Sequence, residues 1–424
     1  MRKKATLLLL GILTITLLLF TGCSERKDYP MTVSVLGHLE EGKYTGTVKK
    51  GLAEGAGHFL SNTSEWDGTF SESVLKEGTI IKGTFELPIG IEKISATIEN
   101  GKISDGSVKG VFSTENGSYE GCFDGKKIIG EGTADALVIT LDLMGEHRVG
   151  IYTGPMLNGL PEGENGSFKT TDDLPEMSYE GGWKEGVFDG DGEIAADQFE
   201  IAFSDAGRKV PKSGSFSGSV KNGVANGEGT FSAENADGVK YTYNGNFNSG
   251  MFSGQGKVEY ESGEVLQGRF KAGNFSPSMG EFFRAIGTYF TPKINFRDEN
   301  VEYIDNHQQN FKSLWGDRDY NEDFDLDEFK KNPSNYECDL VVIDDLYVVQ
   351  AFSKEAWGIK YEELILQSLD GNNIFYVFAY GSTDITEGDQ VDICIMPIDY
   401  TTYKNVNNND VWATFGVLSA YRFN

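Results

Sequence analysis

An acidic run near position 320 is the stretch whose residue types and spacing best suit a chemical role. From Asp317 to Glu328, oxygen-bearing side chains fall at positions 1, 3, 5, 7, 9 and 12, the ligand positions of an EF-hand calcium loop. Position 6, where such a loop needs Gly for its sharp turn, is Glu322. We predict calcium as the metal for this run, with a solvated acidic linker as the alternative. The predicted ligands are Asp317, Asp319, Asn321, Asp323, Asp325 and Glu328.

Catalytic chemistry has no comparable signal in the sequence. The 4 histidines form no zinc-binding spacing, and no Gly-x-Ser-x-Gly nucleophile motif is present. No phosphate-binding glycine loop precedes a helix, and carboxylates are too abundant for one pair to stand out as a glycosidase couple. We therefore expect no catalytic residues, no enzyme activity and no cofactor other than calcium. An envelope hydrolase is the weaker alternative.

The net charge of −28 limits the possible partners. Nucleic-acid binding requires a basic footprint, so no nucleic-acid partner is expected. The same charge opposes docking of the folded surface on anionic lipid.

The first 22 residues have the pattern of a secretory signal peptide. Arg2 and two lysines precede an apolar run that ends at Phe20. The following Phe20-Thr-Gly-Cys23 resembles a bacterial lipobox, which implies that Cys23 becomes the acylated N-terminus of a lipoprotein. We therefore expect a protein anchored by lipid at the extracytoplasmic face of the cell membrane, touching the bilayer through Cys23 only. An uncleaved membrane anchor is the alternative, although the run is short for a span of ~20 residues.

Three stretches, starting at Tyr179, Phe216 and Tyr243, share one pattern of aromatic and glycine residues. Each reads aromatic-x-Gly, then a Gly seven residues after the aromatic, then Gly-x-Gly. Alternate residues share one face of a strand, so the central Gly leaves a gap in which a ring of the next repeat can pack. Asn-Gly pairs, as at Asn158 and Asn222, predict two-residue hairpin turns. Each unit is then a hairpin that buries its aromatic face only by stacking on its neighbours.

This pattern resembles the MORN repeat. Weaker copies start at Tyr44, Tyr119 and Tyr152, and half copies start at Trp66 and Leu266. The resemblance implies a non-catalytic scaffold or spacer, with an envelope or surface protein as partner. We expect the repeat aromatics to pack between repeats and not to form a ligand shelf. The residues that define the repeats are Tyr44, Gly46, Tyr119, Gly121, Tyr152, Gly154, Tyr179, Gly181, Trp183, Phe216, Gly218, Tyr243 and Gly245.

The remaining residues change in character. Helical spacing over residues 278–290, with a capping box from Ser278 to Glu281, predicts a helix that covers the last edge of the sheet, and a second helix is expected within 298–314. Five strand-like runs follow residue 324. With an Asn-Pro-x-x-Tyr segment and a late Glu-Gly-Asp-x-Val turn, they resemble the OB-like barrel found at the C-terminus of many Firmicute surface proteins.

The barrel supports an alternative function, the binding of a glycan or small ligand, with or without the help of calcium. The best candidates for a binding face are Tyr376, Phe378, Tyr400 and Tyr403. Cys338 and Cys394 allow either a disulfide or two thiols. The barrel has no room for the usual OB helix between its third and fourth strands, over residues 381–387.

Taken together, these patterns predict a mainly β protein. It would contain an elongated antiparallel hairpin sheet of MORN repeats, then one or two helices, then a small OB-like β-barrel. The predicted domains are a signal peptide (1–22), a tether (23–43, with a first strand as the alternative), the repeat array (44–275), a helical and acidic connector (276–323) and the barrel (324–424).

Overall fold

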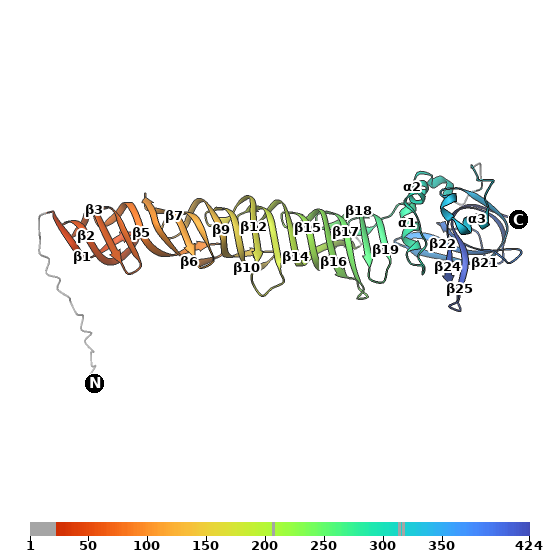
Figure 1. The fold of residues 1–424 in the computed structure, drawn as a ribbon, viewed down its shortest axis with the longest axis horizontal. Coiled ribbons are helices and arrows are strands. Elements are labelled where there is room, and N and C mark those ends of the chain that lie inside the picture. The colour runs from red at the N-terminus through yellow and green to blue at the C-terminus, as the bar shows by residue number, and fades with distance from the viewer. Residues whose placement is uncertain (1–22, 206–207, 313–314, 316–318) are drawn as a thin grey trace, which may run out of the picture. The chain divides into compact units, whose positions relative to one another are not determined.

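The structure is a computed structural model that describes residues 23–424 except 206–207, 313–314 and 316–318 (Figure 1). The predicted signal peptide and Asp317 lie outside the described residues. In the described part of the chain, no helix has the length and apolarity needed to cross a membrane. The fold is mainly β, with a long hairpin sheet, three α-helices and a closed barrel, which confirms the predicted fold class.

Among the described residues, twenty strands belong to one largely antiparallel sheet. Its first strands are β1 (Ser24–Val35), β2 (His38–Lys49), β3 (Leu52–Ser61), β4 (Ser64–Ser71), β5 (Val74–Ile89), β6 (Glu92–Ser104), β7 (Ser107–Thr114), β8 (Gly117–Phe123), β9 (Ile128–Leu143), β10 (Glu146–Leu157), β11 (Leu160–Pro161), β12 (Gly163–Thr170) and β13 (Met177–Lys184). They are followed by β14 (Val187–Asp205), β15 (Arg208–Lys221), β16 (Val224–Glu234), β17 (Lys240–Asn248), β18 (Met251–Tyr260), β19 (Val265–Lys271) and β20 (Asn274–Phe275).

The chain divides into two compact units, and the division lies inside the predicted repeat array. One unit holds the residues up to Leu174 together with Glu180–Gly190, and the other holds Pro175–Tyr179 together with Asp191–Asn424. The last hairpins of the array therefore belong to the same unit as the barrel.

The predicted tether is wrong, and the alternative of a first strand is confirmed. Residues 24–35 form β1, which pairs with β2 from Ser24↔Val48 to Val35↔His38. This segment reads as polar because most of its residues point outward, while Val33 and Val35 at its end are buried.

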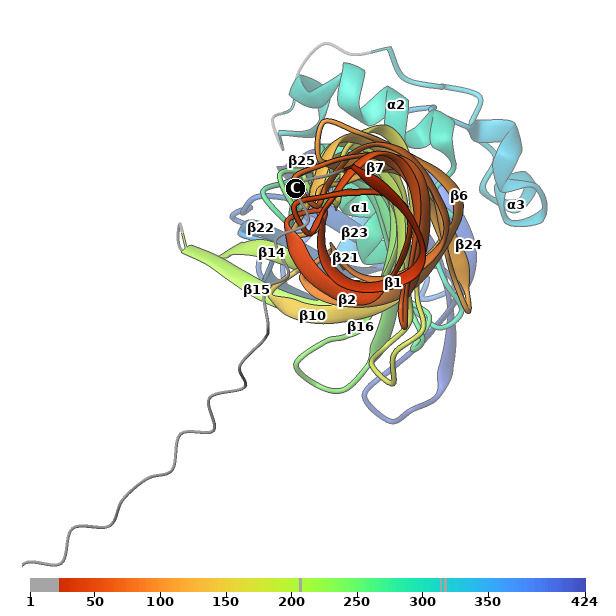
Figure 2. The same cartoon turned by 90° about the vertical axis from the view of Figure 1, so that its left-hand side faces the viewer.

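The sheet of the first unit is rolled, so that hairpin turns form hydrogen bonds with a strand or another turn that is distant along the chain. The Ser34 N–H donates to the Ser73 carbonyl (2.8 Å), and the Gly90 N–H donates to that of Gly159 (2.8 Å). Seen from its end, the strands of this unit curve round a common interior (Figure 2). Trp66 and Phe112 are among the fully buried side chains there, so the core lies inside the roll.

The aromatic residue of a repeat lies along its own strand, above two glycines. A Cβ added to Gly245 would lie 2.6 Å from the Tyr243 hydroxyl, and one added to Gly256 on the paired strand would lie 2.5 Å from it. The Tyr243 hydroxyl then donates to the carbonyl of Asn246 (2.8 Å). The gap left by the central Gly is thus filled by the ring of the same repeat, which corrects the expectation that a ring of the next repeat enters it.

The ring of the next repeat packs against that aromatic instead. The contact is edge-to-face in four places, with centroids 5.1–5.4 Å apart and planes at 78–84°. The second ring always comes from four residues after the start of the next copy, including the half copies at Trp66 and Leu266. Packing between repeats is therefore confirmed, and the four pairs are Tyr44–Phe70, Tyr152–Trp183, Phe216–Phe247 and Tyr243–Phe270.

The predicted hairpin turns and the stretch in which the motif decays are both part of the array. Asn222 and Gly223 have φ of 51° and 72°, as a type I′ hairpin turn requires. Residues 71–116, where the motif decays, form β5, β6 and β7, each antiparallel to the next. They are hairpins of the same sheet, as predicted.

Helix α1 (Met279–Gly287) ends the array and is confirmed with its capping box. The Ser278 side chain accepts from the N–H of Glu281, and the Glu281 carboxylate accepts from the N–H of Ser278. That carboxylate also lies above Gly268 of β19, where a Cβ would be 2.5 Å from Glu281 Cδ, and accepts from the Arg269 N–H (3.1 Å). Because this last copy starts with Leu266, Glu281 takes the place that a tyrosine ring occupies in full copies.

The C-terminal strands form a closed barrel in the order β21-β22-β23-β25-β24, with β23 and β25 parallel. Helix α3 precedes β21, and the described residues 381–389 carry no helix, as the short spacing there predicted. The elements after α1 are α2 (Asp298–Asn306), η1 (Gln308–Phe311), α3 (Leu326–Lys331), η2 (Pro333–Tyr336), β21 (Val341–Ala356), β22 (Ile359–Ser368), β23 (Ile374–Tyr380), β24 (Gln390–Lys404) and β25 (Asp410–Phe423).

Candidate ligand-binding site

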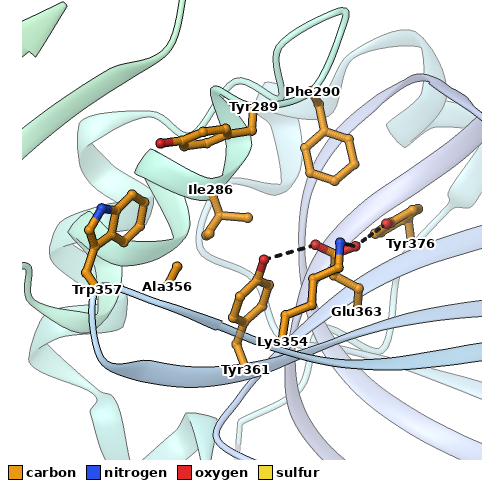
Figure 3. A pocket seen from close by; sticks show the side chains of 9 residues that line it. All are labelled: Ile286, Tyr289, Phe290, Lys354, Ala356, Trp357, Tyr361, Glu363 and Tyr376. Atoms are coloured by element: carbon orange, nitrogen blue, oxygen red, sulfur yellow. Dashed lines mark hydrogen bonds and ion pairs between the residues drawn. The ribbon is translucent and has the colours of Figure 1, made fainter. Parts of the chain in front are cut away.

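A cavity of about 450 Å³ lies between the end of α1 and the barrel, within the second unit (Figure 3). Its walls come from three parts of the chain: the last turn of α1 and the residues after it, the β21–β22 hairpin, and β23. The volume is in the range of small-ligand sites. The lining residues are Ile286, Tyr289, Phe290, Lys354, Ala356, Trp357, Tyr361, Glu363 and Tyr376.

The β21–β22 hairpin carries most of the polar and aromatic lining. Its turn is Trp357-Gly358, with φ of 51° and 75°, so an indole occupies a position that usually needs a small residue. Edge-to-face contacts with Phe275 (5.1 Å) and Phe282 (5.9 Å) hold this indole. In Figure 3 the Trp357 ring lies across the cavity from Glu363, beside Tyr289.

Glu363 on β22 is the polar centre of the cavity. Its side chain is 4% exposed, and its carboxylate accepts hydrogen bonds from three donors: the Tyr376 hydroxyl (2.6 Å), Lys354 Nζ (2.7 Å) and the Tyr361 hydroxyl (3.3 Å). Burial, with the nearby Glu363 charge, raises the pKa of both tyrosines far above the usual value. Both phenols therefore stay protonated and keep donating to the carboxylate.

The two ends of the Lys354–Glu363 ion pair differ in exposure. The Lys354 side chain is 46% exposed, against 4% for Glu363. The anion is fixed by buried hydroxyls, whereas the cation reaches it from the solvent side. The arrangement suits holding a charged or polar ligand among aromatic faces more than proton transfer, because all three neighbours of the carboxylate are donors.

The predicted calcium ligands do not converge in the described residues, where no group of three or more acidic, His or Cys side chains could hold a metal ion. Asp325 caps α3 by accepting from the N–H groups of Asp327 and Glu328. Glu328 accepts from the Tyr336 hydroxyl (3.1 Å), and Asn321 donates to Asp339 (2.7 Å). With Asp317 outside the described residues, calcium binding by this run stays a prediction.

The expected aromatic face of the barrel is only partly present at the surface. Tyr376 and Phe378 are buried and form no exposed face, because both rings pack against Phe415 in a hydrophobic cluster that also contains Phe282 and Phe283 of α1. Tyr376 still reaches the cavity through its hydroxyl. Tyr400 stacks on Trp412 (5.0 Å), which is 58% exposed.

Other predicted positions are placed as follows. Cys23 is exposed at the start of the described chain, and Cys338 and Cys394 are thiols without a disulfide between them. The Cys338 thiol donates to the carbonyl of Glu299 (3.3 Å), and burial raises its pKa to about 11. The aromatic residues that define the repeats are buried, at Tyr44, Tyr119, Tyr152, Tyr179, Trp183, Phe216 and Tyr243.

The sequence analysis missed the main residues of the cavity, Lys354, Trp357, Tyr361 and Glu363. One signal was available: Glu362 and Glu363 interrupt the otherwise apolar run Tyr361–Leu366. Two adjacent acids in a strand buried on both faces must each find donors. Glu362 does so with Thr383, whose N–H (3.1 Å) and hydroxyl (2.5 Å) both donate to it.

Comparison with known proteins adds no assignment: no family model matches the chain, and no curated protein matches it either.

Proposed function

We propose that this chain is a non-catalytic lipoprotein of the MORN-repeat type, anchored through acylated Cys23 at the extracytoplasmic face of the membrane. The repeat array acts as scaffold or spacer, and the C-terminal part binds a small ligand in the cavity between α1 and the barrel. The observation that carries this proposal is the cavity itself, in which a buried carboxylate is surrounded by aromatic side chains.

The repeat array supports the role of a scaffold because its aromatic side chains are used in packing. The rings lie above glycines of their own hairpin and against the rings of the next copy, so they are not available to a ligand. A stacked array of this kind gains stability from each neighbouring repeat, which favours a structural role.

The cavity can be tested by filling it. The full protein is screened by thermal unfolding against small envelope components, including amines, amino acids and short glycans. A compound that binds raises the melting temperature by mass action. Ala356→Phe, which places a ring in the cavity, is expected to abolish that rise, whereas Val406→Phe on the exposed β24–β25 loop keeps it. A rise that survives Ala356→Phe would place the binding elsewhere.

The anchor is tested separately. Cys23→Ser should move the protein from the membrane fraction to the soluble fraction, and mass spectrometry of the wild-type N-terminal peptide should show acylation of Cys23. A variant that stays with the membrane would contradict the lipoprotein assignment.

A second candidate is docking of an envelope protein on the outer surface of the array. Partly exposed apolar side chains, such as Leu60, Val111 and Ile151, lie on that surface. Cross-linking on living cells followed by mass spectrometry would show one dominant partner joined to residues 44–275 if this is correct. Cross-links confined to the barrel would contradict it.

A further inference from the structure

We infer that the ligand of the α1–barrel cavity is an organic cation, an ammonium or guanidinium group that takes the place of Lys354 on the Glu363 carboxylate. This inference rests on the proposed function, since it names the ligand class for the same cavity. The evidence for it is the buried Glu363 carboxylate, the exposed Lys354 ammonium beside it and the aromatic walls of the cavity.

Glu363 offers a fixed negative charge. The Tyr376 and Tyr361 hydroxyls hold its two oxygens from within the protein, so the carboxylate is oriented before a ligand arrives. A buried carboxylate left without a cation is costly, so the position beside it demands a positive charge. An anionic ligand would meet repulsion there.

Lys354 supplies that positive charge in the free protein, from an exposed side chain. Its Nζ lies 2.7 Å from Glu363 Oε2, and nearly half of its side chain is open to solvent. A lysine stem has four rotatable bonds, so it can turn outward at small cost and leave the carboxylate to another cation. The lysine thus acts as an internal stand-in for the ligand.

The walls of the cavity suit a cation with an apolar surface. Tyr289 and Trp357 lie on one side (centroids 6.2 Å apart), and Phe290 lies edge-on to Tyr376 on the other (5.3 Å). Aromatic faces attract ammonium and guanidinium groups, most strongly in sites shielded from water. The net charge of −28 also raises the local concentration of cations and speeds their encounter.

The test uses the full protein, with choline as the probe and 3,3-dimethyl-1-butanol as its neutral isostere of equal shape. Binding is followed by Trp fluorescence and by saturation transfer to the probe methyl groups. We expect choline to bind at least about tenfold more tightly than the isostere. Lys354→Met should tighten choline binding about tenfold by removing the competitor. Glu363→Gln should weaken it at least about tenfold by removing the charge.

The opposite effects of the two substitutions distinguish recognition of the cation from damage to the fold. If the Lys354–Glu363 pair only stabilised the fold, both variants would lose choline binding. Nα-acetyl-lysine amide and Nα-acetyl-arginine amide, tested beside choline, distinguish a side chain of a peptide from a free amine as the source of the cation. Unfolding curves of each variant show whether it is folded.

Three results would overturn the inference. If the neutral isostere binds as tightly as choline, the cavity binds ligands without selecting for positive charge, and the proposed function would stand. Equal effects of Lys354→Met and Glu363→Gln would give the ion pair a structural role only. No binding of any cation to the wild type or to Lys354→Met would reject the ligand class, and the Ala356→Phe screen would then decide separately whether the cavity binds anything.

Discussion

The two glycines of one Gly-x-Gly motif should respond very differently to alanine. Gly254 has φ of +66°, but a Cβ there would meet only Asn246 Cβ at 3.8 Å. Gly256 needs no left-handed backbone, but a Cβ there would lie 2.5 Å from Cε2 and from the hydroxyl of Tyr243. The first substitution costs backbone strain, and the second must displace a ring.

The magnitudes follow from these contacts. Gly254→Ala should cost about 1 kcal/mol, the strain of a left-handed non-glycine residue. In Gly256→Ala the Tyr243 ring must move although it stacks on Phe252 at 3.7 Å and meets Phe270 at 5.1 Å, so overpacking costs about 2 kcal/mol. The hydrogen bond from Tyr243 to Asn246 is lost as well, which adds about 1 kcal/mol. The free energy of unfolding should therefore fall by about 3 kcal/mol in Gly256→Ala.

The assay must read the second unit alone, because a chain with two compact units need not unfold in one step. Hydrogen exchange of the β17–β19 amides, measured at increasing urea concentration, gives that local free energy. A double-mutant cycle with Tyr243→Leu tests the cause: once the ring is shortened, Gly256→Ala should cost less than about 1 kcal/mol. If Gly254→Ala is the more costly change, or if the costs of Gly256→Ala and Tyr243→Leu simply add, then the Tyr243 ring is not what excludes a side chain at Gly256.

Three further predictions concern single side chains. Tyr152→Phe should lower the free energy of unfolding by about 1 kcal/mol, because the Tyr152 hydroxyl donates a hydrogen bond to a carbonyl at 2.7 Å. Tyr44→Phe should leave that free energy unchanged, since the buried Tyr44 hydroxyl has no partner among the described residues. Urea denaturation of both variants compares the two effects. Asp172→Asn should lower the free energy of unfolding by about 3 kcal/mol at pH 7, because it removes the negative charge from a mostly buried, two-bond ion pair with Arg148. The hydrogen bonds from Arg148 hold the pKa of Asp172 below its usual value, so the stabilisation by this pair is present above the unfolded pKa of about 3.9 and is lost as the pH falls through the lower folded pKa. Denaturation at pH 7 and at pH values below 4 should show the free energies of unfolding of the wild type and the variant converging. A constant difference between them would contradict the assignment. Glu281→Ala should lower the local free energy of unfolding by about 2 kcal/mol, because it removes the helix cap and the hydrogen bond to β19. Hydrogen exchange of the β19 amides measures this change. Unchanged protection of these amides would count against the role of α1 as the end of the array.

The repeats were predictable because their pattern is local. An aromatic, a Gly two residues later and a Gly-x-Gly on the return strand lie within one hairpin, so spacing along the chain reports contact in space. What the spacing did not show is which ring fills the gap above the glycine, because a Tyr two residues away and a ring from the next copy satisfy the same pattern. Both half copies keep the ring that packs on the preceding copy, Phe70 or Phe270, and only the copy that starts at Leu266 lacks an aromatic of its own.

The acidic run shows how one spacing can serve two purposes. An Asp followed by acids two and three residues later matches the end of a calcium loop, and it equally matches a helix N-cap with negative charges in the first turn. In the structure Asp325 caps α3, and Asp327 and Glu328 occupy its first turn. The cavity was beyond prediction for another reason: it joins α1, a hairpin turn and β23, and no local period connects them.

Helix α1 links the array to the cavity in physical terms. The last copy of the repeat lacks an aromatic at Leu266, so Gly268 would leave a hollow at the end of the array, and the Glu281 carboxylate fills it. That contact fixes the position of the helix, and less than two turns later Ile286 and the residues after it become a wall of the cavity. The end of the repeat array and the cavity are therefore both in contact with helix α1. A spacer that merely carried the barrel would need no such contact, so under the proposed function the array would also set the shape of the ligand cavity.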